Sequence, residues 1–380
     1  MDKPNSLSRR SFFGVVTAAP LAAALPAGCA PRPAEPPATE ESPNTILLKD
    51  YRPHSLYKIP QTQISRAKFP IIDVHSHDYA KTDSDVARWV GIMDEVGVER
   101  TVILSQATGA EFDAVYAKYS KHPTRFEVWC GFDTAGYDHP GYGPAAVREL
   151  ERCHEKGAKG VGELGDKGKG MDWGKATGMH PDDPRLDPLF EKCAQLGLPV
   201  NLHVADPIWM YEKMDLHNDG LMNAYKWRLD NQPGIVGHSG MMEILERAVR
   251  RHSHTTFIAC HLANLCYDLT RLGEVLDRNP NLYADISARY AETATIPRFV
   301  GKFYAKYAGR ILYGTDMGFQ PHMYHITFRE LESSDEHFYE IDQFGYHWSM
   351  NGFGLADSIL RQLYRENALK IFRSRKKTAA

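Results

Sequence analysis

The sequence predicts a (β/α)8 barrel, also called a TIM barrel, from two observations. From about residue 68 onward, short runs rich in β-branched and aromatic residues alternate with segments of helical periodicity, which is typical of parallel β/α units. Eight such runs fit within roughly 300 residues, whereas a doubly wound sheet usually has about five to seven strands. The expected strands cover residues 70–74, 101–105, 126–130, 160–164, 199–203, 256–260, 282–286 and 311–315.

Helix signals fall between these strands. Apolar residues over 86–93 recur at the spacing of an amphipathic helix, residues 82–85 offer N-terminal caps, and Gly97 fits the helix end. Pro144 is expected to open the helix before the fourth strand. Gly197 is expected to close the helix before the fifth.

Two long insertions are expected on the catalytic face, over residues 205–240 after strand 5 and 317–354 after strand 8. Both are rich in aromatic residues, and Trp209 in the first is a candidate for substrate contact. The alternatives that stay open for the pair are a lid that forms the wall of a pocket, and packing over the barrel top or in the interface of a homodimer.

The first 45 residues predict an export signal followed by a linker. Arg9 and Arg10 precede a mildly apolar stretch, which resembles a twin-arginine export signal, with a cytoplasmic N-terminal helix as the alternative. The segment ending at Cys29 resembles a lipoprotein cleavage box, although Pro26 departs from the usual aliphatic residue. We therefore expect an export signal over 1–29, a proline-rich linker over 30–45 and the barrel domain over 46–375.

The predicted cellular location follows from this export signal. The protein is expected to be exported, either to the periplasm or to a lipid anchor at Cys29 in the bacterial envelope. Lys and Arg number 45 and Asp and Glu 48, so the net charge of −3 offers no basic excess for nucleic acid. No uninterrupted apolar run reaches the roughly 18 residues of a membrane span. A small-molecule substrate is the expected partner.

Polar residues follow several expected strands. His75 and His77 form a His-x-His pair at the end of strand 1, where the two-residue period turns both imidazoles to one side. His203, His261 and Asp316 hold the same position on strands 5, 6 and 8. Any one of these histidines alone would more simply be a core or surface group. Agreement at four strand ends favours a divalent metal, and imidazoles with a carboxylate suit zinc best.

These motifs occur in a definite order along the chain. They are Asp73-Val74-His75-Ser76-His77, Asn201-Leu202-His203, Ala259-Cys260-His261 and Leu312-Tyr313-Gly314-Thr315-Asp316, followed by a C-terminal segment with Arg365-Glu366-Asn367-Ala368. Over about residues 68–375 the set resembles the amidohydrolase superfamily, and within it the amidohydrolase-related branch that includes aminocarboxymuconate-semialdehyde decarboxylase.

The resemblance implies a barrel with a divalent metal held by His75, His77, His203 and Asp316. It further implies that His261 acts on the substrate or joins a second metal. It does not imply a substrate, because members of the superfamily hydrolyse amides, lactones and esters, and some decarboxylate or hydrate.

Strand 4 leaves the number of metals, one or two, open. Binuclear members often carry a bridging carboxylated lysine or a glutamate there. Glu163 ends this strand, whereas Lys159 lies four residues earlier at the wrong level of the barrel. Glu163 is therefore expected either to bind metal or to orient a liganding imidazole. Lys167 just beyond is interpreted as a loop charge.

The expected activity is metal-dependent hydrolysis of an amide, lactone or ester carbonyl. Asp316 would take the proton of the attacking water and deliver it to the leaving group, while His261 supports the oxyanion. Arg228 and Arg289 are candidates for clamping a substrate carboxylate, with a solvated surface role as the alternative.

Two other functions stay open. The first is metal-dependent, non-oxidative decarboxylation of a small unsaturated or aromatic carboxylate, which would use the same ligands. The second is a non-catalytic metal-binding protein, which an open shell and two large loops disfavour. One ion with Glu163 free of metal would favour decarboxylation, and two ions bridged by Glu163 would favour hydrolysis.

Overall fold

The computed structural model describes residues 43–341 and 346–378. Arg9, Arg10 and Cys29, on which the export and anchor predictions rest, lie outside these residues. The chain divides into two units, Met1–Ile46 and Leu47–Ala380, and the fold below is that of the second. Among the described residues, no helix combines the length and the apolar character that a membrane span requires.

Eight parallel strands form a barrel, which confirms the predicted fold. Hydrogen bonding runs in the orders β1-β2-β3 and β4-β7-β8-β9-β10. A bridge from Cys130 to Val161 connects β3 to β4, and the amide of Val74 donates to the carbonyl of Tyr313, at 3.0 Å, where β10 has just ended. The strands are β1 (Ile71–Ser76), β2 (Val98–Leu104), β3 (Phe126–Trp129), β4 (Val161–Asp166), β7 (Val200–Val204), β8 (Phe257–Ala259), β9 (Leu282–Asp285) and β10 (Ile311–Leu312).

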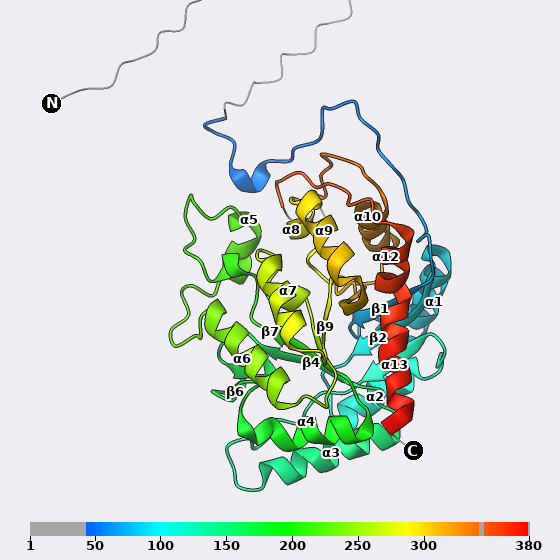
Figure 1. Ribbon diagram of the computed structural model, residues 1–380, viewed down its shortest axis with the longest axis vertical. Coiled ribbons are helices and arrows are strands. Elements are labelled where there is room, and N and C mark those ends of the chain that lie inside the picture. The colour runs from blue at the N-terminus through cyan, green and yellow to red at the C-terminus, as the bar shows by residue number, and fades with distance from the viewer. Residues whose placement is uncertain (1–42, 342–345, 379–380) are drawn as a thin grey trace, which may run out of the picture. The chain divides into compact units, whose positions relative to one another are not determined.

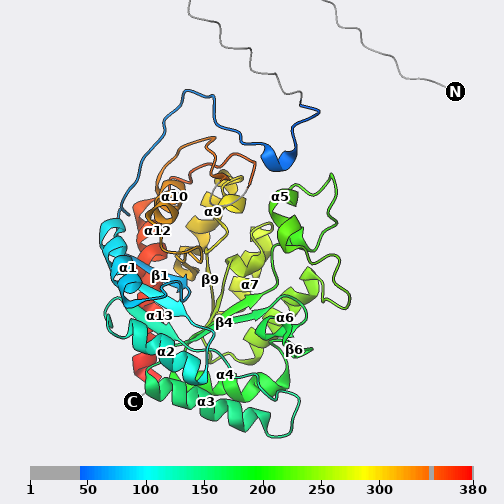
Figure 2. The same ribbon diagram turned by 180° about the vertical axis from the view of Figure 1, so that it is seen from behind.

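A helix follows each strand and lies outside the ring of strands (Figures 1 and 2). These helices are α1 (Asp83–Val96), α2 (Gly109–Tyr119), α3 (Tyr142–Lys156), α4 (Asp187–Leu196), α6 (His238–Arg251), α7 (Leu269–Arg278), α9 (Pro297–Tyr307) and α13 (Asn367–Thr378). The last continues from α12 (Asp357–Arg361) through a π-helical turn over Gln362–Glu366.

Local signals explain where these helices begin and end. Thr82 and Asp85 form a reciprocal capping box at the start of α1, and Gly97 ends it with a φ of 91°, as expected. The prediction that Pro144 opens α3 was wrong, because α3 begins at Tyr142 and the proline lies inside its first turn. Proline is tolerated there because the first amides of a helix have no partner within the helix.

The insertions carry short elements of their own. The one after β7 holds α5 (Leu221–Ala224), and the one after β10 holds α10 (Pro321–Glu332). The segment after β9 holds α8 (Tyr290–Thr293). A further insertion after β4 was not predicted, and it forms an antiparallel pair of β5 (Gly170–Met171) and β6 (Ala176–Thr177). Strands of two residues are too short to show a period in the sequence.

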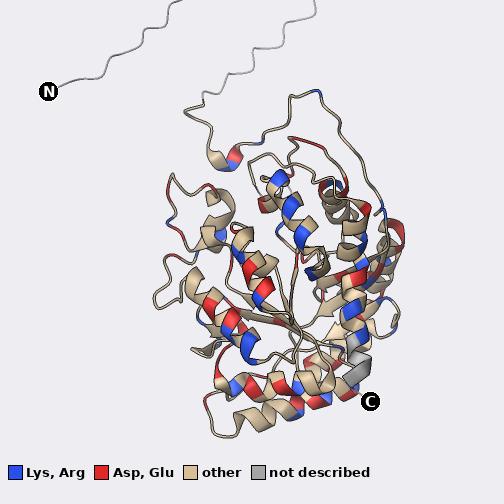
Figure 3. Cartoon of the chain, viewed as in Figure 1, with Lys and Arg blue, Asp and Glu red and all other residues tan. Residues whose placement is uncertain are grey.

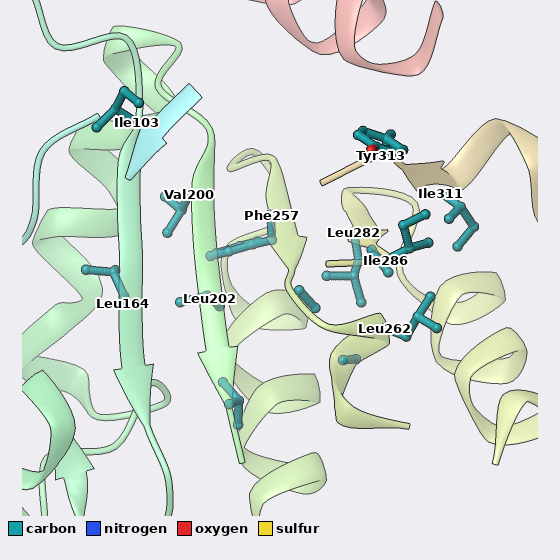
Figure 4. Packing of buried hydrophobic residues seen from close by; sticks show 14 of the residues in the cluster. Ile103, Leu164, Val200, Leu202, Phe257, Leu262, Leu282, Ile286, Ile311 and Tyr313 are labelled. Atoms are coloured by element: carbon teal, nitrogen blue, oxygen red, sulfur yellow. The ribbon is translucent and has the colours of Figure 1, made fainter. Parts of the chain in front are cut away.

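Apolar packing beside the strands supports the polar strand ends. Figure 4 shows side chains of neighbouring strands in this layer, among them Leu164, Val200 and Phe257. Val200 and Phe257 are fully buried. Because such interiors are close-packed, the layer fixes the relative positions of the strand ends that carry the polar groups.

Candidate metal centre

Six polar side chains converge at the C-terminal ends of five strands. They are His75 of β1, His77 just after β1, Glu163 of β4, His203 of β7, His261 just after β8, and Asp316 just after β10. The structure thus brings together every residue that the sequence predicts as a metal ligand or catalytic group. His75, Glu163, His203 and His261 are buried, while His77 and Asp316 are partly exposed.

Glu163 lies between two pairs of histidines. Its Oε1 is 2.6 Å from His203 Nδ1 and 3.4 Å from His261 Nε2. Its Oε2 is 3.6 Å from His77 Nε2, and His75 Nε2 is 3.8 Å from Oε1. One carboxylate therefore belongs to two groups of potential ligands, one with His75 and His77 and one with His203, Cys260 and His261.

Asp316, which follows β10, completes the cluster on the side of the barrel opposite Glu163. Its Oδ1 is 2.9 Å from His77 Nε2 and 3.6 Å from His75 Nε2, and its Oδ2 is 3.6 Å from His261 Nε2. Burial alone would raise the pKa of Asp316, but the charge of His75 and the hydrogen bond with His77 hold it well below its ordinary value. The carboxylate is therefore ionised.

Each imidazole is fixed through the nitrogen that faces away from the cluster. Asp285 Oδ2 lies 3.1 Å from Nδ1 of His75, and the carbonyl of Leu104 accepts from Nδ1 of His77 at 2.9 Å. The carbonyl of Ser287 accepts from Nδ1 of His261 at 2.8 Å. Such contacts orient ligating histidines in metal sites and leave the other nitrogen for the metal.

His203 is fixed by a different contact. Its Nε2 lies 3.0 Å from Asp206 Oδ1, and Asp206 Oδ2 accepts from Lys167 Nζ at 2.8 Å. His203 therefore presents Nδ1 to Glu163, whereas His77 and His261 present Nε2.

The donor set fits a divalent cation. Nε2 of His75 is buried and has no hydrogen-bond partner among the described residues, which costs about 1–3 kcal/mol when nothing binds it. Burial would lower the pKa of His75, but Asp285 and Asp316 raise it to about 10. The carboxylates of the cluster thus favour positive charge at this position. Protons on the imidazoles can supply that charge, and so can a bound metal ion. Nitrogen and oxygen donors suit Zn²⁺ and other divalent transition ions alike.

Cys260 also contacts this cluster, but as a donor. Its Sγ donates to Glu163 Oε1 at 3.4 Å and to the carbonyl of Leu202 at 3.2 Å. Burial raises the pKa of the thiol well above its ordinary value. In its neutral form the thiol helps to hold Glu163, and its sulfur also belongs to the group of potential ligands around His203 and His261.

Besides Asp206, two acidic residues of the centre were missed by the sequence analysis. Asp285 Oδ1 accepts from the amides of His261 and Ser287, both at 3.1 Å, while its Oδ2 orients His75. Asp73 accepts from the amide of Thr315 at 3.1 Å and from its hydroxyl at 2.6 Å, which ties β1 to the segment after β10. A carboxylate within a buried apolar strand was the available signal for both.

A cavity of about 240 Å³ opens beside the cluster and is bounded by His203, His261 and Asp316. Trp227 of the first long insertion and Tyr346 of the second line its other side. The insertions are joined there, because Asn223 Nδ2 donates to the hydroxyl of Tyr346 at 2.7 Å. This arrangement favours the pocket-wall interpretation of the two insertions.

The residues predicted to bind substrate lie in different places. Arg289 lines the cavity. Arg228 pairs with Asp230 at 2.7 Å and lies outside the lining, as does Trp209, whose Nε1 donates to Asp219 at 2.5 Å. Lys167, interpreted from sequence as a loop charge, also lines the cavity.

The chain belongs to the amidohydrolase family, whose model matches residues 65–374. No curated protein is similar enough to this sequence to count as a match. Among solved structures, an uncharacterized TIM-barrel protein from Bordetella bronchiseptica is 15% identical with a TM-score of 0.53, over 81% of this chain and all of that one. A 2,6-dihydroxybenzoate decarboxylase in complex with 2,6-dihydroxybenzoate is 15% identical with a TM-score of 0.52, over 80% of this chain and 99% of that one. These similarities show the fold.

Proposed function

We propose that the protein is a metal-dependent hydrolase that cleaves an amide, lactone or ester of a small molecule in the cavity beside the cluster. Family membership and the buried donor set support metal-dependent chemistry. The observation that carries hydrolysis is the position of Glu163 between two groups of histidines, because a shared carboxylate is what a two-metal site requires.

Decarboxylation is the second candidate, and one ion with Glu163 free of metal would favour it. The central position of Glu163, with both of its oxygens facing imidazole nitrogens of the cluster, favours the two-ion alternative. The likeness to a decarboxylase, at 15% identity, concerns the fold and carries no weight between the two reactions.

In this proposal His75, His77 and Asp316 would hold one ion and His203 and His261 would hold the other, with Glu163 within reach of both groups. This differs from the ligand set that the resemblance implies, in which His203 belongs with the first ion. Bound divalent ions lower the pKa of water toward neutrality and polarise a carbonyl group. Asp316 borders the cavity as an ionised carboxylate, so it can accept the proton of the attacking water and return it to the leaving group. The Tyr79 hydroxyl donates to the backbone carbonyl of Asp316 at 2.8 Å and steadies this segment.

The position of His261 supports one of its two expected roles. Burial lowers the pKa of His261, so the ring is neutral, and its Nδ1 proton is directed to the carbonyl of Ser287. A lone pair on Nε2 then faces Glu163. A neutral ring in this tautomer binds an ion, whereas it stabilises an oxyanion only after it gains a proton. We therefore assign His261 to the second ion.

The test combines metal analysis with turnover. Mass spectrometry measures the metal content of the purified protein. Its turnover is measured with amides, lactones, esters and aryl carboxylates that share one aryl group. We expect two ions per chain and hydrolytic turnover, and His261→Asn should lose one ion and nearly all turnover. The matched control is His252→Asn, because His252 is also buried and paired with a carboxylate, Asp187, away from the cluster. One ion together with release of CO2 would overturn hydrolysis.

A further inference from the structure

Arg289 is a buried cation on the wall of the cavity. It follows β9, its exposed fraction is 8%, and it lines the same cavity as His261 and Asp316. A buried charge is costly unless hydrogen bonds and an opposite charge compensate it. The partners of Arg289 therefore indicate what the cavity is built to receive.

The guanidinium group has two donors to spare. Its Nε and Nη2 both donate to Asn264 Oδ1, at 3.2 and 2.6 Å, and Nη1 donates to the carbonyl of Ala288 at 2.6 Å. A guanidinium has five N–H groups, so one on Nη1 and one on Nη2 have no hydrogen-bond partner among the described residues. Two neighbouring N–H groups are the arrangement that binds a carboxylate through both oxygens.

The nearest acid does not use these donors. Glu292 Oε1 is 3.9 Å from Arg289 Nη1, which is beyond hydrogen-bond distance, and it accepts from the hydroxyl of Tyr346 at 2.6 Å. The oxygens that Arg289 does contact belong to neutral groups. The charge of Glu292, which is also buried, offsets that of Arg289 across this distance, so the two spare donors lack hydrogen-bond acceptors among the described residues rather than an opposite charge.

The guanidinium is also held in place before any ligand binds. Asn264, which accepts two of its hydrogen bonds, donates from Nδ2 to the carbonyls of Val204 and Ala205 at 3.2 and 2.9 Å. Asn264 is fully buried. A donor fixed in this way loses little conformational entropy when an anion arrives.

We propose that the substrate of this site carries a carboxylate group, separate from the carbonyl that is cleaved, and that Arg289 binds it through Nη1 and Nη2. Lys167, the other cation of the lining, is already paired with Asp206. Met210, Met317 and Trp227 give the same cavity an apolar side, which suits a hydrocarbon or aromatic body. A volume of about 240 Å³ is below the roughly 300–1,000 Å³ of common ligand pockets, so the substrate is small.

The assignment of a substrate rests on the proposed function, but binding of the anion does not require turnover. The test uses the purified, metal-containing protein and isothermal titration with benzoate and acetophenone, which share a ring and a carbonyl but differ in charge. We expect wild type to bind benzoate at least tenfold more tightly than acetophenone, and Arg289→Met to lose that preference while keeping its affinity for acetophenone.

Arg310→Met is the matched control, because Arg310 is also partly buried and donates to neutral carbonyls, including that of Leu282, but does not line the cavity. Benzoate held only by the metal ions would bind Arg289→Met as tightly as wild type, and this result would overturn the proposal. So would equal affinities of wild type for the two probes.

Arg289→Lys covers the case in which Arg289→Met does not fold. It keeps the charge without the paired donors, and we expect a smaller loss of benzoate affinity; no loss would overturn the proposal. Failure of hydrolysis across the substrate panel, with the benzoate preference intact, would refute the proposed reaction and leave the carboxylate site standing.

Discussion

His75 and His77 are two residues apart and serve the same cluster, yet the fold depends on them to different degrees. The side chain of His75 is fully buried and faces Asp285 and Ser287, both buried as well. The side chain of His77 is 21% exposed. Removing the His75 side chain leaves a cavity and takes a polar partner away from the buried Asp285 and Ser287. Removing the His77 side chain only opens a site that water already reaches.

We therefore predict that His77→Ala and His75→Ala both lose metal and turnover but differ in stability. With metal chelated from every sample, His77→Ala should unfold within about 1 kcal/mol of wild type. His75→Ala should lose about 1–3 kcal/mol, because it leaves Asp285 with less compensation. Urea denaturation and metal analysis measure both effects, with His252→Ala as a buried control that keeps its metal. Full metal retention in His77→Ala would contradict its role as a ligand.

The sequence analysis predicted a set of residues at the strand ends that the structure brings together, but it did not predict how their side chains are presented. His261 and Asp316 lie beyond short strands, in left-handed conformations with φ of 61° and 58°, so the two-residue period of a strand does not set their direction. Asp206 was missed because it lies in a loop, where no periodicity relates it to His203. Its contact with His203 is local, three residues along the chain, whereas its ion pair with Lys167 depends on the tertiary fold.

At the scale of elements, α10 shows how an insertion can be tied to the barrel through a buried acid. Glu330 on this helix is 1% exposed, and its Oε1 accepts from the hydroxyl of Thr293 at 3.3 Å. Its Oε2 has no hydrogen-bond partner among the described residues. The strand periods of the sequence predicted the long insertion but neither this helix nor its buried acid, because a single glutamate on an amphipathic segment is normally exposed.

Glu330 makes the stability of the fold depend on pH. Burial raises the pKa of Glu330 well above its ordinary value, so the folded protein keeps a proton that the unfolded chain gives up. The stabilisation is complete below the ordinary pKa of glutamate, about 4.3, and is lost as the pH rises toward the folded value. Glu330→Gln should therefore gain stability relative to wild type with rising pH, by at most about 1.4 kcal/mol per unit.

Urea unfolding of both proteins between about pH 5 and pH 8 measures this difference. Glu274→Gln, on the exposed face of α7, is the matched control and should show no such trend. A difference between Glu330→Gln and wild type that stays constant with pH would show that Glu330 is not protonated in the fold.

At the scale of the whole molecule, the barrel could be predicted because its strands and helices repeat with two clear periods. Charges of both signs alternate along the outer helices (Figure 3), and Arg278 of α7 pairs with Glu246 of α6 at 2.6 Å.

The predicted export signal lies at residues 1–29, ahead of the described barrel. We propose that the protein is exported after it has folded.

Folding before export has a consequence for the metal. Raw affinity for nitrogen and oxygen ligands places Cu²⁺ above Zn²⁺, so a chain that folded in the envelope would favour copper where copper is present. The resemblance of the N-terminal segment to a twin-arginine signal implies a route that exports folded proteins. On that route the availability of metals in the cytoplasm, rather than raw affinity, selects the ion. The buried donors His75 and His203 would then be occupied before the protein reaches the envelope.

We predict that replacing Arg9 and Arg10 together by lysine leaves an active, metal-loaded precursor in the cytoplasm. Cell fractionation, metal analysis of the retained protein and its turnover measure this outcome. Arg32→Lys, in the linker beyond the signal, is the control and should be exported as wild type is. Undiminished export of the double variant would refute the proposed route, and a retained precursor without metal would show that the ion is acquired after export.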